Sequence, residues 1–245
     1  MQKNVEKMTF NYSPNFDLKK RDKNKIKYII YHYTGMKNDK LAIKKLTSPS
    51  SNVSCHYYIN AYGKIIQMVP DLYVAWHAGK SNWGNHKSLN RNSIGIEISN
   101  PGNEHGYRKF SSNQIKSLIK ISKILIKKYS IDKNKILGHS DIAPLRKIDP
   151  GEKFPWKLLS KKKIGIWHNM NSKKLKSFRG KKTNLDLDKF LIYLKNLGYH
   201  MEYSSLYELR KIVKIFQMRF RPEMIDGKLD TECYKIAKSL YNLKK

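Results

Sequence analysis

Two short apolar runs, IKYIIYHYTG (26–35) and SIGIEISNPG (93–102), constrain the fold of this chain most strongly. The first run is rich in β-branched and aromatic residues and ends at a glycine, and the second is rich in isoleucine and ends at Pro-Gly; both patterns are typical of buried strands. SSNQIKSLIKISKILIKKYS (111–130) instead repeats isoleucine and leucine near the 3.6-residue period behind a serine cap, which predicts an amphipathic helix. Strands alternating with helices predict an α/β fold, a mixed central β-sheet flanked by helices.

Further patterns extend this domain and add a second one. SCHYYINAYGKIIQMVP (54–70) predicts a hairpin that turns at residues 60–63, and DKLAIKKLTS has helical spacing. Near the C-terminus three helical patterns, at about 185–197, 205–220 and 231–243, predict a small all-α three-helix domain. The expected organisation is therefore an N-terminal arm (1–25), a main α/β domain (26–160), a linker (161–182) and a three-helix domain (183–245).

Composition bounds the functions that the chain can have. Its net charge of +31 favours polyanionic partners, but lysine outnumbers arginine and the lysines are scattered along the chain. Specific nucleic-acid readout favours the arginine fork, so we expect no specific nucleic-acid partner. The two cysteines, Cys55 and Cys233, predict neither a disulfide framework nor a cysteine-rich metal site.

Nothing in the sequence reads as a membrane or export segment. No apolar run approaches the roughly 18 residues that a membrane span needs. The N-terminal segment has no apolar core and no lipid-acceptor cysteine, so we expect neither a signal peptide nor a lipobox.

The segment GHSDIAPLRKIDPG (138–151) concentrates chemically useful residues. Pro144 and Pro150 predict a non-helical loop that presents His139, Lys147 and Asp149. A hydrolytic zinc site needs three imidazole or carboxylate ligands, a group that moves the proton and a donor to the oxyanion.

Two residues of the predicted strands could join these loop residues. His32 lies near the end of the first run, and Glu97 interrupts the second. Spacing alone leaves structural alternatives open, because no HExxH or paired CxxC motif is present. His32 could be a core histidine, His139 a turn cap, Asp149 a helix cap and Glu97 a member of a buried ion pair.

An ordered set of motifs resembles the zinc-dependent N-acetylmuramoyl-L-alanine amidases, in particular their AmiD-type members. The motifs are YHYTG, SCHYYI, YGKIIQMVP, AWHAGKSNW, NSIGIEISN, GHSDIAPLRKIDPG and FPW, and they cover roughly residues 25–160. The C-terminal segment VKIFQMRFRPEMIDGKLDTECYKIAKSL (213–240) resembles two helices of a peptidoglycan-binding module. It departs from the usual pattern after Gly227, at Lys228–Asp230. The resemblance implies a fold like that of phage lysozymes and peptidoglycan-recognition proteins.

The resemblance also implies roles for single residues. His32, His139 and Asp149 match the Zn²⁺ ligands, Glu97 the catalytic carboxylate and Lys147 the catalytic lysine. His77 of the WHAG motif matches a position in the substrate groove, and we expect Trp76 beside it to contact substrate as well.

The predicted function is hydrolysis of the amide between N-acetylmuramic acid and L-alanine in peptidoglycan or muropeptides, through a zinc-bound water. The alternatives are a non-catalytic peptidoglycan-binding protein and a nucleic-acid binder that its charge attracts. We expect a monomer. The resemblance implies the cell envelope, periplasm or outer membrane, whereas the absence of an export signal leaves the cytoplasm as the alternative.

Overall fold

The structure is a computed structural model that describes residues 9–183 and 185–244. Its contacts divide the chain into two units. One holds the chain up to residue 79 together with residues 90–131, and the other holds residues 80–89 together with the chain from 132 onward.

The first unit contains a mixed sheet whose strands lie in the order β1-β5-β4-β9-β3. Its strands are β1 (Thr9–Phe10), β3 (Tyr28–Tyr33), β4 (Tyr57–Ile59), β5 (Ile65–Gln67) and β9 (Ser93–Ile98). β9 is parallel to both β3 and β4, β4 and β5 form the predicted hairpin, and β1 is parallel to β5. Both strands predicted from the apolar runs, and the hairpin, are confirmed.

The segment predicted as an N-terminal arm is in part built into this unit. Besides β1 it supplies β2 (Phe16–Asp17), which pairs antiparallel with β6 (Val74–Ala75). Its first eight residues lie outside the described part of the chain. The arm therefore contributes strands to the domain that follows it.

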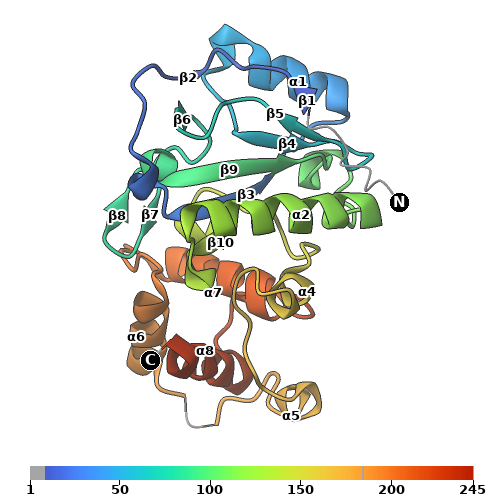
Figure 1. Cartoon of the computed structure of the whole chain (residues 1–245). Coiled ribbons are helices and arrows are strands. Elements are labelled where there is room, and N and C mark those ends of the chain that lie inside the picture. Colours follow the sequence, from blue (N-terminus) through green and yellow to red (C-terminus); the bar gives the residue numbers. More distant parts are fainter. Residues whose placement is uncertain (1–8, 184, 245) are drawn as a thin grey trace. The chain divides into compact units, whose positions relative to one another are not determined.

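Two helices cover opposite faces of the sheet in the first unit, α1 (Asp39–Thr47) and α2 (Ser112–Tyr129) (Figure 1). Successive side chains of a strand point to opposite faces of the sheet, and the neighbouring tyrosines of β4 follow this rule. The hydroxyl of Tyr58 donates to Asp39 of α1, whereas the hydroxyl of Tyr57 donates to Asp71 on the face where Tyr129 of α2 also binds. The sheet is thus buried on both sides, which explains why its strands are apolar runs.

The start of α2 follows the predicted cap. The Ser111 hydroxyl accepts from the Gln114 backbone N–H, and the Gln114 side-chain oxygen accepts from the Ser111 backbone N–H. This reciprocal capping box contributes about 1 kcal/mol. It fixes the first turn of the helix that covers one face of the sheet.

The buried carboxylate of Asp71 organises the polar part of the first unit. It accepts hydrogen bonds from Tyr57 (2.7 Å), Tyr129 (2.6 Å) and Lys128 (2.7 Å). Arg21, itself buried, donates to the backbone carbonyl of Asp71 through Nε and Nη2. One acidic side chain thereby ties the segment after β5 to β4 and to the end of α2.

The second unit is mainly helical. It contains the short strands β7 (Asn82–Trp83), β8 (His86–Lys87) and β10 (Ile136–Gly138). Its helices are α3 (His139–Ile142), α4 (Trp156–Lys161), α5 (Ser172–Lys176), α6 (Leu187–Leu197), α7 (Leu206–Phe220) and α8 (Thr231–Lys244). Short 3₁₀ helices also occur along the chain, at Lys23–Lys25, Pro49–Ser51, Leu89–Asn92, Asn103–His105 and Lys133–Lys135.

The prediction that residues 138–151 contain no helix is wrong for their first turn. His139–Ile142 forms α3, and Ala143 caps its C-terminus. Pro144 ends this turn rather than preventing it, because its ring and its missing N–H would disrupt only a helix that continued through it, and Ala143 before it is already non-helical. The rest of the segment, up to Gly151, follows the predicted irregular path.

The three predicted C-terminal helices are confirmed as α6, α7 and α8. Phe190 of α6 packs its ring edge against Phe216 of α7, with ring centroids 5.6 Å apart. The Asp230 side chain accepts from the backbone N–H of Cys233 and so caps α8.

Domain boundaries at 160 and 183 stay predictions. No helix within residues 9–183 and 185–244 combines the length and the apolar character that crossing a membrane requires.

We predict that Asp71→Ala lowers the free energy of unfolding by about 3 kcal/mol, because two buried tyrosine hydroxyls lose their acceptor. Burial alone would raise the pKa of Asp71, but the hydrogen bonds from Lys128, Tyr129 and Tyr57 outweigh it and hold that pKa below its usual value. A depressed folded pKa gives stability that is complete above the unfolded pKa, near 4, and is lost as pH falls through the folded pKa. Denaturant unfolding at pH 7 and at acidic pH measures both effects.

The matched control is Asp22→Ala, which removes an exposed carboxylate that pairs with the exposed Lys25. It should change stability by less than about 0.5 kcal/mol. Equal losses in the two variants would contradict the role of Asp71.

Candidate active site

The pairing of β3 with β9 places two candidate residues side by side. The strands are parallel and in register, with His32 opposite Glu97. Paired residues on adjacent strands point to the same face of a sheet. His32 is buried, Glu97 is half-buried, and Tyr58 of β4 lies opposite Glu97 on its other side.

The ring of His77 lies within hydrogen-bond distance of the ring of His32. Its Nδ1 lies 3.0 Å from Nε2 of His32, and its Nε2 lies 3.2 Å from the Ser93 hydroxyl. A Cβ on Gly95 would lie only 2.4 Å from the His77 ring, so the ring needs the glycine of β9. A hydrogen bond at one ring nitrogen of a histidine fixes the tautomer and the orientation of the ring. His77 therefore determines which nitrogen of His32 is available to a ligand.

In the second unit, His139 and Asp149 face each other across the segment predicted to carry them. His139 Nδ1 lies 3.1 Å from a carboxylate oxygen of Asp149, and both side chains are buried. The backbone N–H of Ser140 donates to the carbonyl of Asp149 at 2.8 Å, which joins the two ends of the segment. A Cβ on Gly138 would lie 2.6 Å from Pro150, so glycine is needed there as well.

A buried ion pair holds the strand end that precedes His139. Asp141 accepts from the Gly138 backbone N–H (2.7 Å), from the Tyr199 hydroxyl (2.6 Å) and from Arg219. Arg219 of α7 also donates to the carbonyl of Ile136 and stacks over the Trp156 ring at 4.2 Å. Burial and the charge of Asp141 raise the pKa of Tyr199, which keeps its hydroxyl protonated as a donor.

The sequence analysis missed this support, although a signal was present. Arg219 and Arg221 stand beside the apolar residues Ile215, Phe216 and Phe220 at the end of α7. A buried arginine requires a partner: Arg219 pairs with Asp141, and Arg221 pairs with Asp226, Asp230 and Glu232.

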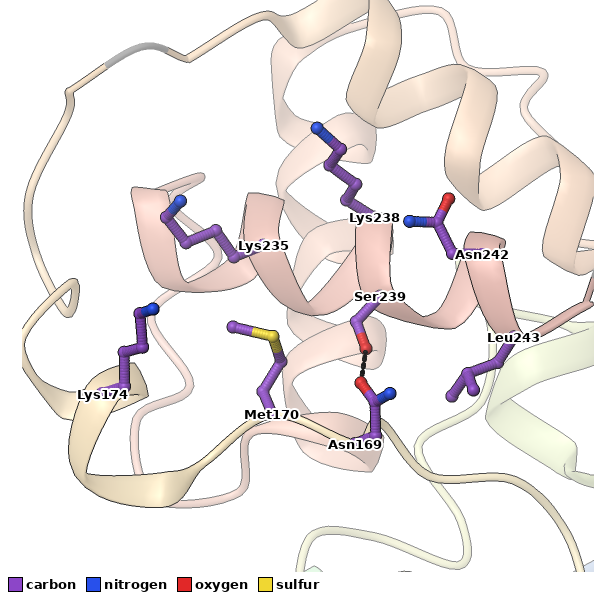
Figure 2. A pocket seen from close by; sticks show the side chains of 8 residues that line it. All are labelled: Asn169, Met170, Lys174, Lys235, Lys238, Ser239, Asn242 and Leu243. Carbon is purple, nitrogen blue, oxygen red and sulfur yellow. Dashed lines mark hydrogen bonds between the residues drawn. The ribbon is translucent and has the colours of Figure 1, made fainter.

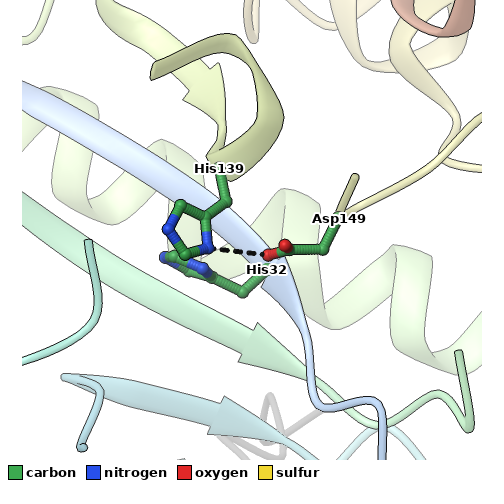
Figure 3. A group of neighbouring side chains, drawn as sticks. All are labelled: His32, His139 and Asp149. Carbon is green, nitrogen blue, oxygen red and sulfur yellow. Dashed lines mark hydrogen bonds and ion pairs between the residues drawn. The ribbon is translucent and has the colours of Figure 1, made fainter. Parts of the chain in front are cut away.

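The predicted metal ligands come together. His32, His139 and Asp149 each offer one ligand atom, and these atoms all lie within 4.8 Å of one another (Figure 3). All three residues are buried. Two imidazoles and one carboxylate form a group that could hold a metal ion.

Lys147 and Trp76, two other predicted site residues, are more accessible to solvent than the three candidate ligands. Lys147 is half-buried, and its backbone N–H donates to Ala143. Trp76 is half-buried and donates from its indole N–H to Asp17 at 2.8 Å. The sequence analysis did not single out Arg146, whose guanidinium lies 3.5 Å from His139 Nε2 and donates to the carbonyl of Lys80.

Cys55 and His56 are buried in the core of the first unit. Cys55 packs against Met68 in the apolar cluster under α1. Burial, followed by the charge of Arg21, lowers the pKa of His56 to about 3, so this histidine is neutral. Its Nδ1 accepts from the backbone N–H of Gly95.

Comparison with known proteins identifies the family. The family model described as N-acetylmuramoyl-L-alanine amidase matches residues 22–152. Over 230 residues the chain is 34% identical to N-acetylmuramoyl-L-alanine amidase AmiD of Escherichia coli, covering 88% of this chain and 82% of that protein. The chain belongs to the N-acetylmuramoyl-L-alanine amidase family.

Other relatives agree with this assignment. The chain is 40% identical to 1,6-anhydro-N-acetylmuramyl-L-alanine amidase AmpD of Haemophilus influenzae over 105 residues, 42% of this chain and 55% of that protein. The structure of E. coli AmiD in complex with the substrate anhydro-N-acetylmuramic acid-L-Ala-D-γ-Glu-L-Lys superposes with a TM-score of 0.80 at 34% identity. That match covers 89% of this chain and 90% of the other.

A second solved structure covers almost the whole chain. Pseudomonas aeruginosa AmpDh3 in complex with anhydromuramic pentapeptide gives a TM-score of 0.80 at 27% identity, over 99% of this chain and 98% of the other. The predicted family, the mixed α/β fold class and the predicted activity as an amidase are therefore confirmed.

We predict that Arg219→Leu lowers the free energy of unfolding by about 3 kcal/mol, because it leaves the Asp141 carboxylate buried without its cation. Tyr199→Phe removes one hydrogen bond to the same carboxylate and should cost about 1 kcal/mol. Arg210→Leu, an exposed position on the same helix, is the matched control and should be near neutral. Guanidinium unfolding measures all three, and an Arg219→Leu midpoint equal to that of the control would contradict the anchoring role.

Proposed function

We propose that this amidase cleaves the bond between the lactyl group of N-acetylmuramic acid and L-alanine with a zinc ion held by His32, His139 and Asp149. The observation that supports the proposal most is the approach of three ligand atoms to within 4.8 Å of one another. The AmiD complex holds a muramyl-peptide substrate and the AmpDh3 complex holds anhydromuramic pentapeptide, which indicates the substrate class.

The donor set fits zinc better than other common cations. Catalytic zinc sites use three protein ligands drawn from imidazole and carboxylate, whereas magnesium and calcium prefer all-oxygen ligands. The support of His32 by His77 at 3.0 Å matches the hydrogen-bonded histidines that metal sites require. Zinc in such a site supplies Lewis-acid activation of water and of the substrate carbonyl at neutral pH.

The chain's own residues then manage the proton and the charge. We assign Glu97 as the base that takes a proton from the attacking water and delivers it to the departing alanine nitrogen. Lys147 supplies a positive charge to the oxyanion that forms on the lactyl carbonyl. The carbon–nitrogen bond breaks, the water oxygen remains on the lactyl group as a carboxylate, and L-alanine leaves with a free amine.

His77 and Trp76 retain proposed roles at the substrate side of the site. Because His77 is buried against Gly95, its main contribution in this proposal is to orient His32. Trp76 is partly accessible and can contact the muramyl group. We further propose that the enzyme is a monomer acting in the cell envelope, and that its C-terminal helices bind peptidoglycan.

We predict that chelation abolishes muropeptide hydrolysis and that Zn²⁺ restores it, because the proposed reaction needs a metal ion to activate the water and the substrate carbonyl. His139→Ala should lose metal binding and activity together, whereas His105→Ala, an exposed histidine, should retain both. Released peptide and bound zinc are measured on the same samples. Full activity in protein that contains no metal would refute the zinc assignment, and sacculus binding without released peptide would favour the non-catalytic alternative.

We predict that Glu97→Gln lowers kcat by about 10²–10⁴-fold, because the amide cannot accept the proton of the water. Zinc content should stay unchanged, since Glu97 is not a proposed ligand. Glu104→Gln, which neutralises an exposed glutamate, is the control and should keep full activity. An undiminished kcat in Glu97→Gln would exclude this residue as the base.

A further inference from the structure

Four lysines surround one cavity of the second unit, although the lysines are scattered along the sequence. The cavity measures about 530 Å³, within the usual range for small-ligand pockets. Lys133, Lys157, Lys161 and Lys163 line it together with Trp167, His168, Ser160 and Asn134, and no acidic residue does. None of these four lysines forms an ion pair with another described residue, so their charges are available to a ligand.

Two ring nitrogens at this cavity lack partners within the described part of the chain. The indole Nε1 of Trp167 and the Nδ1 of His168 are buried and make no hydrogen bond. Burial, and then the charge of Lys157, lower the pKa of His168 to about 4, so its ring is neutral at pH 7. Its other nitrogen bonds the backbone of Phe220, which leaves Nδ1 as an acceptor. Trp167 and His168 thus add two aromatic rings to the lining of the cavity beside its positive charge.

A second cationic pocket adjoins the first on α8. It measures about 440 Å³ and is lined by Lys174, Lys235 and Lys238, again without an acidic residue (Figure 2). The Ser239 hydroxyl donates to Asn169 Oδ1 at 2.7 Å, and Leu243 lines both pockets. Neighbouring cationic pockets suit a polymer whose negative charges repeat along its length.

The proposed reaction generates such a polymer. Each cleavage replaces a neutral amide by a free lactyl carboxylate, so a glycan strand stripped of peptides carries one negative charge on every N-acetylmuramic acid. An intact strand has no free lactyl carboxylate.

We propose that the lysine-lined cavity at Trp167 and His168 binds the free lactyl carboxylate of N-acetylmuramic acid, so that the enzyme holds glycan from which the peptides have been removed. The inference rests on the proposed function for the origin of this ligand, but binding itself needs no catalysis. It adds a product-binding site on the second unit that is distinct from His139 and Asp149.

N-acetylmuramic acid and N-acetylglucosamine form a matched pair of probes, because they differ by the lactyl group alone. The chain has four tryptophans, and Trp167→Phe assigns the Trp167 indole N–H resonance by its loss. N-acetylmuramic acid should shift this resonance saturably and bind on the order of tenfold more tightly than N-acetylglucosamine, the effect of one charge-assisted contact. Equal shifts with both sugars, or shifts confined to the other tryptophans, would overturn the proposal.

Charge variants separate the cavity from the general positive charge of the protein. Lys157→Gln/Lys161→Gln should lose the preference for N-acetylmuramic acid. The control Lys40→Gln/Lys44→Gln changes two exposed lysines of α1 by the same charge and should keep it. An equal loss in the control would show non-specific attraction and sink the proposal. Tighter binding of inorganic phosphate than of N-acetylmuramic acid would reassign the cavity to a phosphate group.

Sedimentation with sacculi tests the polymer. The full-length Glu97→Gln protein, which cannot alter the substrate, should pellet several-fold more with sacculi stripped of stem peptides than with intact sacculi, and the Lys157→Gln/Lys161→Gln change should remove this difference. Equal pelleting with both preparations would contradict the proposal. Binding of N-acetylmuramic acid at Trp167 together with no amidase activity would refute the proposed function and leave this site intact.

Discussion

The register between β3 and β9 is the constraint on which the chemistry of the first unit depends. It sets His32 opposite Glu97, so a proposed metal ligand and the proposed proton carrier share one face of the sheet. A shift by one residue would turn either side chain to the opposite face. Gly95 adds a second condition in the same strand, because only a residue without a Cβ leaves space for the His77 ring behind His32. Register and glycine together define the position of the first imidazole.

Local patterns predicted the elements well where packing and periodicity agree. The capped helix α2, the hairpin of β4 and β5 and the three C-terminal helices all follow from spacing and turn residues. The strand order does not, because two buried apolar runs give no information about which neighbour each strand chooses. The single turn α3 was also beyond local rules, since Pro144 determines where a helix ends and not whether one turn precedes it.

The candidate ligands were identified through family motifs, whereas their supports needed the structure. His77 was expected beside substrate, but its burial and its hydrogen bond to His32 depend on contacts between segments distant in the sequence. The same holds for Asp141, whose three donors come from Gly138, Tyr199 and Arg219. The lysine-lined cavity is a further case, because its residues span positions 133 to 243 and only folding gathers their charge.

The ion pair between Arg219 and Asp141 has a consequence for how such enzymes diversify. It links α7 to the turn that begins with His139, so the last helices are part of the scaffold of the catalytic segment. An exchange of these helices for another module would leave the buried Asp141 carboxylate without its cation, in the same turn as His139. Recombination at this boundary would give a stable protein only when the incoming segment supplies a cation at the position of Arg219. The segment that carries Asp141 and the helix that carries Arg219 are therefore expected to be inherited together.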